Sequence, residues 1–418
     1  MPVARAFKEA TGIDFRIELS EVDNINADLI LEQFSGKSRF DVALPATFGL
    51  PDLVSAGAIR DVSAYARRYE PPGFRDGILY RVGDSFDEKT YGFQADGDAY
   101  VMFYHMDLLT SGAEQARYAD RFGVALKPAR TWQELDRQMA YFHRPDDGLW
   151  GGLLFRTPGY IVWEWWVRFH AQGMWPFTPD VEPLIATPTG VAVLEDMIAA
   201  TQYLHPDTSH LGLFGNMARF AEGNTFCNIG WGGSQKHFNK PQSRIKDRIV
   251  FGPTPGGFVD DSFIATPYFN WGWDYVVTSS SQMPEIAYLF SLFASSPEMS
   301  TLAVRQADGY FDPIRPEHYR DPGIVSAYSE AFLDVHRASL EEAIPDLYLA
   351  GQGDYLSALS DMILLALNRE VTADVAMRRA AEKWDLITRR IGRDAQIRRW
   401  RFLQKKYPAT VRSLLRYD

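Results

Sequence analysis

Cysteine is almost absent from this sequence, because Cys227 is the only one among 418 residues. A single cysteine excludes an internal disulfide and a zinc site built from several cysteines. Long apolar runs are missing as well, since no stretch approaches the ~20 residues that a membrane-spanning helix requires. Acidic residues outnumber basic ones, 54 to 43, which gives a formal net charge of -11. This acidic balance argues against a nucleic-acid partner, because phosphate groups are bound by basic surfaces.

The sequence also lacks the short motifs that mark common enzyme active sites. It contains neither a GxSxG nucleophile elbow nor an HExxH metal motif. A glycoside hydrolase is one hypothesis for this sequence, because paired carboxylates and aromatic rings build sugar-cleaving sites. Asp96 and Asp98 are, however, too close in sequence to predict the separation that two catalytic carboxyl groups need. No sequence motif therefore supports an enzyme, and we predict no enzyme activity, no cofactor and no metal.

Helices and strands alternate in the first hundred residues, which predicts an α/β protein. A helix is expected from residue 2 to residue 11, where Gly12 supplies the C-cap, and a second over 25–35, closed by Gly36. Between them, residues 13–22 alternate apolar and polar like a half-buried strand, and "DVALPA" reads as a buried parallel strand. Because a βαβ unit begins on a strand, we expect a strand and a signal peptide to precede this sequence.

The rest of the chain continues with strands, a helical middle and a helical end. Residues 90–104 read as strand, acidic turn and strand, and a capping box formed by Thr131 and Glu134 starts a helix. Strands are expected at "TFCNIGW" and "RIVFGPTPGG". Two helices follow "NWGWDYVVTSS", the first capped by Ser280 or Ser281 and the second by Ser296.

Taken in order, these segments resemble the family-1 extracellular solute-binding proteins of bacterial ABC importers, the class that includes maltose-binding protein. The resemblance is carried by a collinear set of motifs: "DVALPA", "YGFQADGDAYVMFYHMDLL", "KPARTWQELDRQM", "RFAEGNTFCNIGWGG", "FGPTPGG" and "NWGWDYVVTSS". It departs from the family at both ends, because the usual first strand and glycine-rich loop are missing and the C-terminus continues beyond the usual last helix.

The resemblance implies a two-lobed periplasmic-binding-protein fold of type II, with a hinge and a ligand cleft between the lobes. Residues 1–107 and 269–312 would form the N-terminal lobe, and residues 108–268 and 313–418 the C-terminal lobe with extra helices. Such a protein captures a carbohydrate or polyol in the periplasm as a monomer and delivers it to a membrane permease. Alternative solutes are a polyamine or an organic acid.

Sugars pack their C–H faces on aromatic rings and direct their hydroxyl groups to planar polar side chains. By the resemblance, candidate ligand-binding residues are Thr47, Phe48, Asp96, Asp98, Tyr160, Trp163, Trp231, Asn270, Trp271, Trp273, Tyr310, Asp312 and Arg315. Each also has a plainer interpretation, such as an exposed Asp-Gly-Asp turn or a core tryptophan. Of the two rings in "NWGW", we expect Trp271 to stack on the solute and Trp273 to lie partly in the core.

Charge is unevenly distributed, because the last thirty residues, 389–418, hold ten arginines and lysines against two aspartates, a net +8. This region is interpreted first as a solvated helical face, with Trp400, Phe402 and Leu403 packed inward and some pairing to the acidic body. Docking on a permease or on an anionic membrane is the functional alternative.

Overall fold

The computed structural model describes residues 2–22, 24–36, 39–269 and 272–417. It divides into two compact units, each made of several chain segments. Unit 1 comprises Met1–Asp98, Phe269–Leu333 and Pro345–Gln352, and unit 2 comprises Ala99–Tyr268, Asp334–Ile344 and Gly353–Asp418.

Unit 1 contains a small antiparallel sheet with helices packed against it. Its helices are α1 (Pro2–Thr11), α2 (Ile25–Ser35), α3 (Leu50–Ser55), α4 (Ser63–Tyr69), α12 (Pro284–Ala294), α13 (Pro297–Val304) and α14 (Pro322–Tyr328), with 3-10 turns η1 (Thr47–Gly49) and η4 (Pro316–Arg320). Its strands are β1 (Val42–Ala43), β2 (Ser85–Phe86), β3 (Lys89–Thr90), β4 (Gly92–Gln94) and β12 (Asp274–Val277). The sheet order is β1-β12-β4, and both pairings are antiparallel. The loops that leave β1 and β4 carry candidate site residues.

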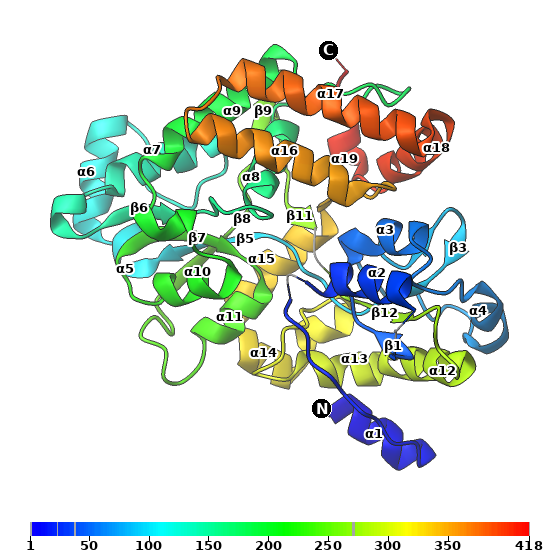
Figure 1. Ribbon diagram of the computed structural model, residues 1–418. Helices are drawn as coiled ribbons and strands as arrows, with labels where there is room; N and C mark the ends of the chain where they lie inside the picture. Colours follow the sequence, from blue (N-terminus) through cyan, green and yellow to red (C-terminus); the bar gives the residue numbers. More distant parts are fainter. Residues whose placement is uncertain (1, 23, 37–38, 270–271, 418) are drawn as a thin grey trace. The chain divides into compact units, whose positions relative to one another are not determined.

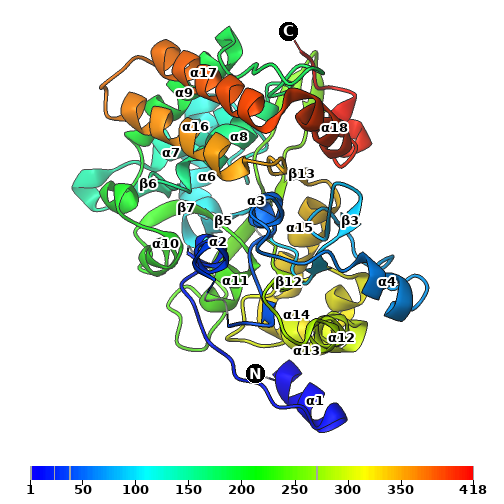
Figure 2. The same ribbon diagram turned by 45° about the vertical axis from the view of Figure 1, so that its right-hand side comes forward.

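The predicted helices at the start of unit 1 are confirmed. Both helices end on glycines with positive φ, Gly12 at 74° and Gly36 at 64°, a conformation that glycine adopts without a steric penalty. Helix α1 packs on α12 and α13 through Val3 and Phe7 (Figure 1, Figure 2). Sequence periodicity therefore located these helices because their caps and apolar faces are local features.

Three local predictions for unit 1 are wrong. Residues 13–22 form no strand, because no strand of the described chain pairs with them, and Leu19 is 85% exposed. Strand β1 runs antiparallel to β12 and is half-buried, so "DVALPA" is not a buried parallel strand. The N-cap of α12 is Met283 rather than a serine, although the Ser281 hydroxyl accepts the amide hydrogen of Met283. The Ser296 cap of α13 is confirmed.

Unit 2 is built on a four-stranded sheet of order β6-β7-β5-β8. Its strands are β5 (Val101–His105), β6 (Trp150–Leu153), β7 (Thr225–Gly230), β8 (Ile249–Pro253), β9 (Gly257–Val259) and β10 (Ser262–Ile264). Its helices are α5 (Met106–Leu109), α6 (Gly112–Phe122), α7 (Trp132–Phe142), α8 (Ile161–His170), α9 (Pro188–Thr201), α10 (Leu213–Phe220) and α11 (Gly232–Phe238), with 3-10 turns η2 (Pro145–Asp147) and η3 (Pro206–Ser209). Strands β6 and β7 are parallel and the other pairings of this sheet are antiparallel. The predicted capping box of Thr131 and Glu134 at the start of α7 is confirmed.

The C-terminal part of unit 2 is helical, as predicted. It consists of α16 (Gln352–Leu367), α17 (Ala373–Ile391), α18 (Arg393–Gln404) and α19 (Ala409–Arg412). Helix α17 packs against α9, and α16 runs beside α17 in both views (Figure 1, Figure 2). The unit boundaries fall within or beside β11 (Tyr268–Phe269), α15 (Glu330–Glu341) and β13 (Ile344–Pro345), and after Gln352, the first residue of α16. Among the described residues, no helix combines the length and apolar character needed to cross a membrane.

Candidate functional site

Three aspartates of unit 1 form a buried acidic cluster. Asp96 and Asp98 lie in the turn that follows β4, and Asp312 lies in the loop between α13 and η4. One carboxylate oxygen from each of the three lies within 4.8 Å of the other two. All three side chains are buried. The structure thus brings together three residues that the sequence analysis had selected in two distant segments.

Main-chain amides and a tyrosine hold this acidic cluster in place. The amides of Gly97 and Asp312 both donate hydrogen bonds to Oδ1 of Asp96. The Tyr328 hydroxyl donates to Oδ1 of Asp312 at 2.7 Å. Burial, followed by the nearby carboxylates, raises the pKa of Tyr328, so this hydroxyl keeps its proton and remains a donor. Oδ2 of Asp312 is buried and has no hydrogen-bond partner among the described residues, so its capacity to accept a hydrogen bond is unused.

The loop that begins at Thr47 lies directly beside the acidic turn. The Thr47 amide donates to the carbonyl of Gly272 at 2.8 Å. A Cβ atom on Gly272 would lie 3.1 Å from the carbonyl oxygen of Asp96 and 3.2 Å from Cγ2 of Thr47. Only glycine fits there without displacing a neighbour. Thr47 is buried, whereas Phe48 and Trp273 are half-buried.

The remaining candidate residues of unit 1 are not part of the acidic cluster. The Tyr310 side chain is 50% exposed. Arg315 is buried and donates to the main-chain oxygen of Ser295, while burial lowers its pKa. Asn270 and Trp271, including the ring expected to stack on the solute, lie outside the described residues.

Unit 2 contains a cluster of aromatic rings that we call the aromatic cluster, formed by Tyr100, Phe155, Tyr160, Trp163 and Trp231. Ring centroids are 4.7 Å apart for Tyr100 and Trp231, 5.1 Å for Tyr160 and Trp163, and 6.0 Å for Trp163 and Trp231. Trp163 meets Trp231 at 90°, so the two rings present faces in different directions. Three predicted residues, Tyr160, Trp163 and Trp231, therefore lie together.

Local structure fixes these rings. Tyr160 is the N-cap of α8 and Trp231 the N-cap of α11, so both rings are anchored at helix starts. All ten residues of α8 are buried. Charged side chains on a buried helix need partners of opposite charge inside the protein. Glu164 of α8 pairs with Arg168 of the same helix and with Arg156. Burial alone would raise the pKa of Glu164, but the two guanidinium groups outweigh it and lower that pKa.

Sequence reasoning missed Tyr100, Phe155 and Tyr328. Tyr100 follows Asp98 by two positions and stands immediately before β5, so its nearness to the acidic turn was the available signal. Phe155 stacks on Tyr160 with ring centroids 4.8 Å apart. No sequence pattern links Tyr328 to Asp312, because the contact depends on how α14 is placed.

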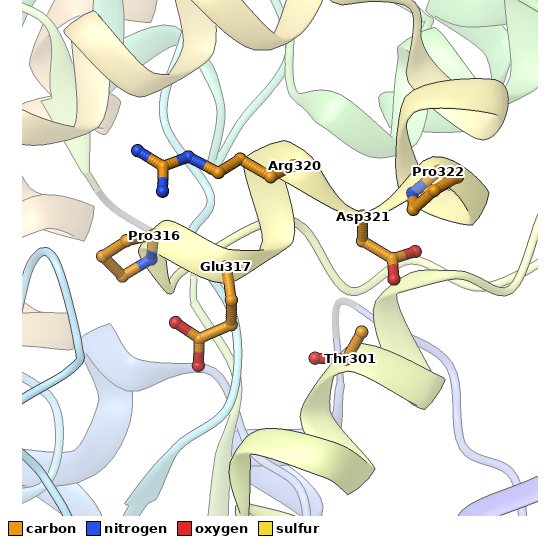
Figure 3. Close-up of a pocket in the computed structure, with 6 residues that line it drawn as sticks. All are labelled: Thr301, Pro316, Glu317, Arg320, Asp321 and Pro322. Carbon is orange, nitrogen blue, oxygen red and sulfur yellow. The ribbon is translucent and has the colours of Figure 1, made fainter.

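Unit 1 also has a surface pocket outside the acidic cluster. Figure 3 shows its lining residues, which come from α13, η4 and the start of α14: Thr301, Pro316, Glu317, Arg320, Asp321 and Pro322. Asp321 pairs with Arg305, and this hydrogen bond is the main cause that lowers the pKa of Asp321 to about 2. No residue of the predicted site lines this pocket.

The chain belongs to the family of bacterial extracellular solute-binding proteins, whose family model matches residues 3–332. No curated protein sequence matches it. The predicted resemblance to solute-binding proteins of this class is thereby confirmed.

Solved structures of similar fold cover nearly the whole chain. A solute-binding protein of an ABC transporter from Agrobacterium radiobacter K84, in complex with ribitol, has a TM-score of 0.78 at 16% identity, covering 92% of this chain and 94% of that chain. Maltose-bound MalE3 of T. maritima has a TM-score of 0.76 at 17% identity, covering 92% and 95%. A solute-binding protein from Agrobacterium vitis S4 with bound D-mannitol has a TM-score of 0.75 at 16% identity, covering 94% and 95%. At these identities the likeness establishes the fold, and it confirms the predicted α/β fold class.

Proposed function

We propose that this protein is the substrate-binding component of an ABC importer and that its solute is a carbohydrate or a polyol. The family supports solute capture outside the cytoplasm, and the ligands of the similar structures are ribitol, maltose and D-mannitol. Release to a membrane permease and action as a monomer in the periplasm belong to the same proposal. Light scattering of the purified protein tests the monomer, and solute uptake by cells with and without the gene tests the transport role.

The observation that carries the choice of solute is the acidic cluster. Ionised carboxylates only accept hydrogen bonds, and hydroxyl groups are donors that match them. Asp98 and Asp312 each offer a carboxylate, and one oxygen of Asp312 has no partner among the described residues. We propose that these oxygens receive solute hydroxyl groups. In unit 2, the five residues of the aromatic cluster are at most 6% exposed, and we propose that its rings supply the faces on which the C–H faces of a sugar pack.

The same acidic cluster supports a second candidate, a cationic solute such as a polyamine. Three carboxylates within 4.8 Å of one another attract positive charge as well as hydroxyl groups. An ammonium group would neutralise part of this charge, whereas a neutral polyol would not. The two candidates therefore differ in their salt dependence, because charge–charge attraction is screened by salt.

Thermal unfolding of the full chain with a solute panel tests the proposal. The panel contains ribitol, D-mannitol, maltose and D-tagatose, with spermidine and citrate as non-sugar controls. A ligand at a hundred times its dissociation constant stabilises the folded state by about 2.7 kcal/mol, which raises the melting temperature by a few degrees. A shift with spermidine alone overturns the carbohydrate proposal, and turnover of a glycoside substrate overturns the binding role.

A further inference from the structure

Helix α18 presents a basic face to solvent. Arg398, Arg401 and Phe402 of α18 and its C-cap residue, Lys405, follow the spacing i, i+3, i+4 and i+7, which places them on one side of the helix. All four side chains are exposed, and the Phe402 ring is 39% exposed. We call these four residues the basic face of α18. The sequence-based expectation that Phe402 packs inward is wrong for this reason.

The opposite side of α18 is anchored in unit 2. Gln396, Trp400 and Leu403 are buried. The Trp400 ring lies 5.4 Å from that of Trp175 and 5.6 Å from that of Phe177, measured between centroids. Because its apolar side is packed, the helix holds the basic face in a fixed orientation toward solvent.

Ion pairs within unit 2 neutralise other cations of the C-terminal region. Arg389 and Arg393 pair with Asp385, Arg390 pairs with Asp354, and Arg416 pairs with Asp260. By contrast, Arg398, Arg401 and Lys405 form no ion pair with any carboxylate in the described part of the chain, and Arg398 donates to the main-chain oxygen of Asp394. Ion pairs with other parts of unit 2 thus neutralise arginines at both ends of the C-terminal region, whereas the cations of the basic face have no carboxylate partner among the described residues.

We infer that the basic face of α18 docks the protein reversibly on a membrane surface rich in anionic phospholipid. The positive charge of this face is complementary to anionic lipid, since a chain of net charge -11 can approach an anionic surface only through a locally basic region. The aromatic residue fits too, because an exposed ring among lysines and arginines is the pattern that inserts at the lipid interface. Lys406 lies over the Phe402 ring at 5.1 Å and adds a further cation there.

A lipid surface suits this face better than a protein surface does. Long basic side chains on a helix need no fixed partner positions, and lipid headgroups rearrange to meet them. Each lysine or arginine near an anionic surface strengthens binding about fivefold, so three give about a hundredfold. Binding of that strength is reversible, which is what a protein that leaves the membrane to collect solute requires.

Sedimentation with lipid vesicles tests the inference. The full chain, without solute, is mixed with phosphatidylcholine vesicles that contain about 30% phosphatidylglycerol, and with phosphatidylcholine vesicles alone. We expect binding only to the anionic vesicles and its loss at about 0.5 M salt. The variant R398E/R401E/K405E is expected to lose binding at least a hundredfold, whereas F402S weakens it several-fold.

A matched charge variant controls for net charge. R67E/R121E/R244E changes three exposed arginines that also form no ion pair with a described residue, so it has the same net charge and is expected to bind nearly as the unmodified protein does. Equal loss in both variants, or no binding of the unmodified protein, overturns the inference. Binding that appears only when vesicles contain the permease assigns the face to an acidic protein surface and overturns lipid docking. The assay contains no solute, so it is independent of the proposed solute.

Discussion

The main-chain amide of Asp312 donates a hydrogen bond to the carboxylate of Asp96, which lies 216 positions earlier in the chain. The same oxygen of Asp96 accepts the amide of Gly97 at 2.8 Å. Asp96 therefore joins the loop after α13 to the turn after β4 and serves two main-chain donors at once. This contact gives Asp96 a structural task, because it links two segments that are far apart in the chain.

Replacing Asp96 by alanine is expected to destabilise the folded protein by about 1–3 kcal/mol, because two buried amides lose their acceptor. Urea unfolding followed by circular dichroism measures this change. D96N is the matched control, since the asparagine side-chain oxygen still accepts both bonds, and it is expected to cost less than half as much. Equal destabilisation by both variants would contradict this role.

Asp98 and Asp312 are expected to act on solute binding rather than on stability. D98N and D312N remove a charged acceptor, and a hydrogen bond to a charged group is worth about 1.5–3 kcal/mol, which is a loss of about ten- to a hundredfold in affinity. D312N keeps the oxygen that accepts the Tyr328 hydroxyl. Isothermal titration with the solute found by thermal screening measures the effect. Unchanged affinity in both variants would remove the acidic cluster from the binding site.

Local signals predicted local structure well. The capping box of Thr131 and Glu134 and the Ser296 cap are confirmed because each depends on residues three positions apart. Residues 13–19 alternate like a strand yet form none, since alternation describes side-chain placement but does not supply a partner strand.

Long-range features of the candidate site were less accessible. Asp96 and Asp312 are separate candidates through the family resemblance, and nothing in either segment predicts their hydrogen bond. The contact of Tyr328 with Asp312 also depends on the tertiary position of α14. Residue types and family order therefore predicted candidates, whereas the grouping of those candidates required the fold.

Tryptophan fluorescence is expected to report solute binding through the aromatic cluster. Trp163 and Trp231 meet edge to face in this cluster, and a sugar that stacks on either ring changes its surroundings. W163F and W231F are expected to reduce both the solute-induced emission change and the affinity, the latter by about threefold to tenfold. W165F is the control, because Trp165 lies on the same helix as Trp163 but stacks on Phe169, outside the aromatic cluster. A full emission change in W163F and W231F would exclude stacking there.

The ion pairs of Glu164 are expected to dominate the stability of α8. E164Q leaves the buried Arg156 beside a neutral side chain, whereas Arg168 keeps its ion pair with Asp136. Loss of the carboxylate is expected to cost about 3–5 kcal/mol of unfolding free energy. Because the guanidinium groups lower the pKa of Glu164, its contribution is present above the unfolded pKa and is lost as pH falls through the folded pKa. The stability gap between the unmodified protein and E164Q should therefore narrow in acid. Urea unfolding at a series of pH values measures it, and a constant gap would contradict the assignment.

Asp274 is expected to give the opposite pH dependence. Its carboxyl oxygens are buried and have no hydrogen-bond partner among the described residues. Burial, followed by the charge of Asp84, raises its pKa, although Arg75 acts against this. Below the unfolded pKa both states hold the proton, and above it only the unfolded state ionises, so each further pH unit costs about 1.4 kcal/mol until the folded pKa is passed. D274N removes this cost. Its stability should match that of the unmodified protein in acid and exceed it increasingly from about pH 4 upward, as measured by urea unfolding. A difference that stays constant with pH would show that Asp274 is ionised in the folded state.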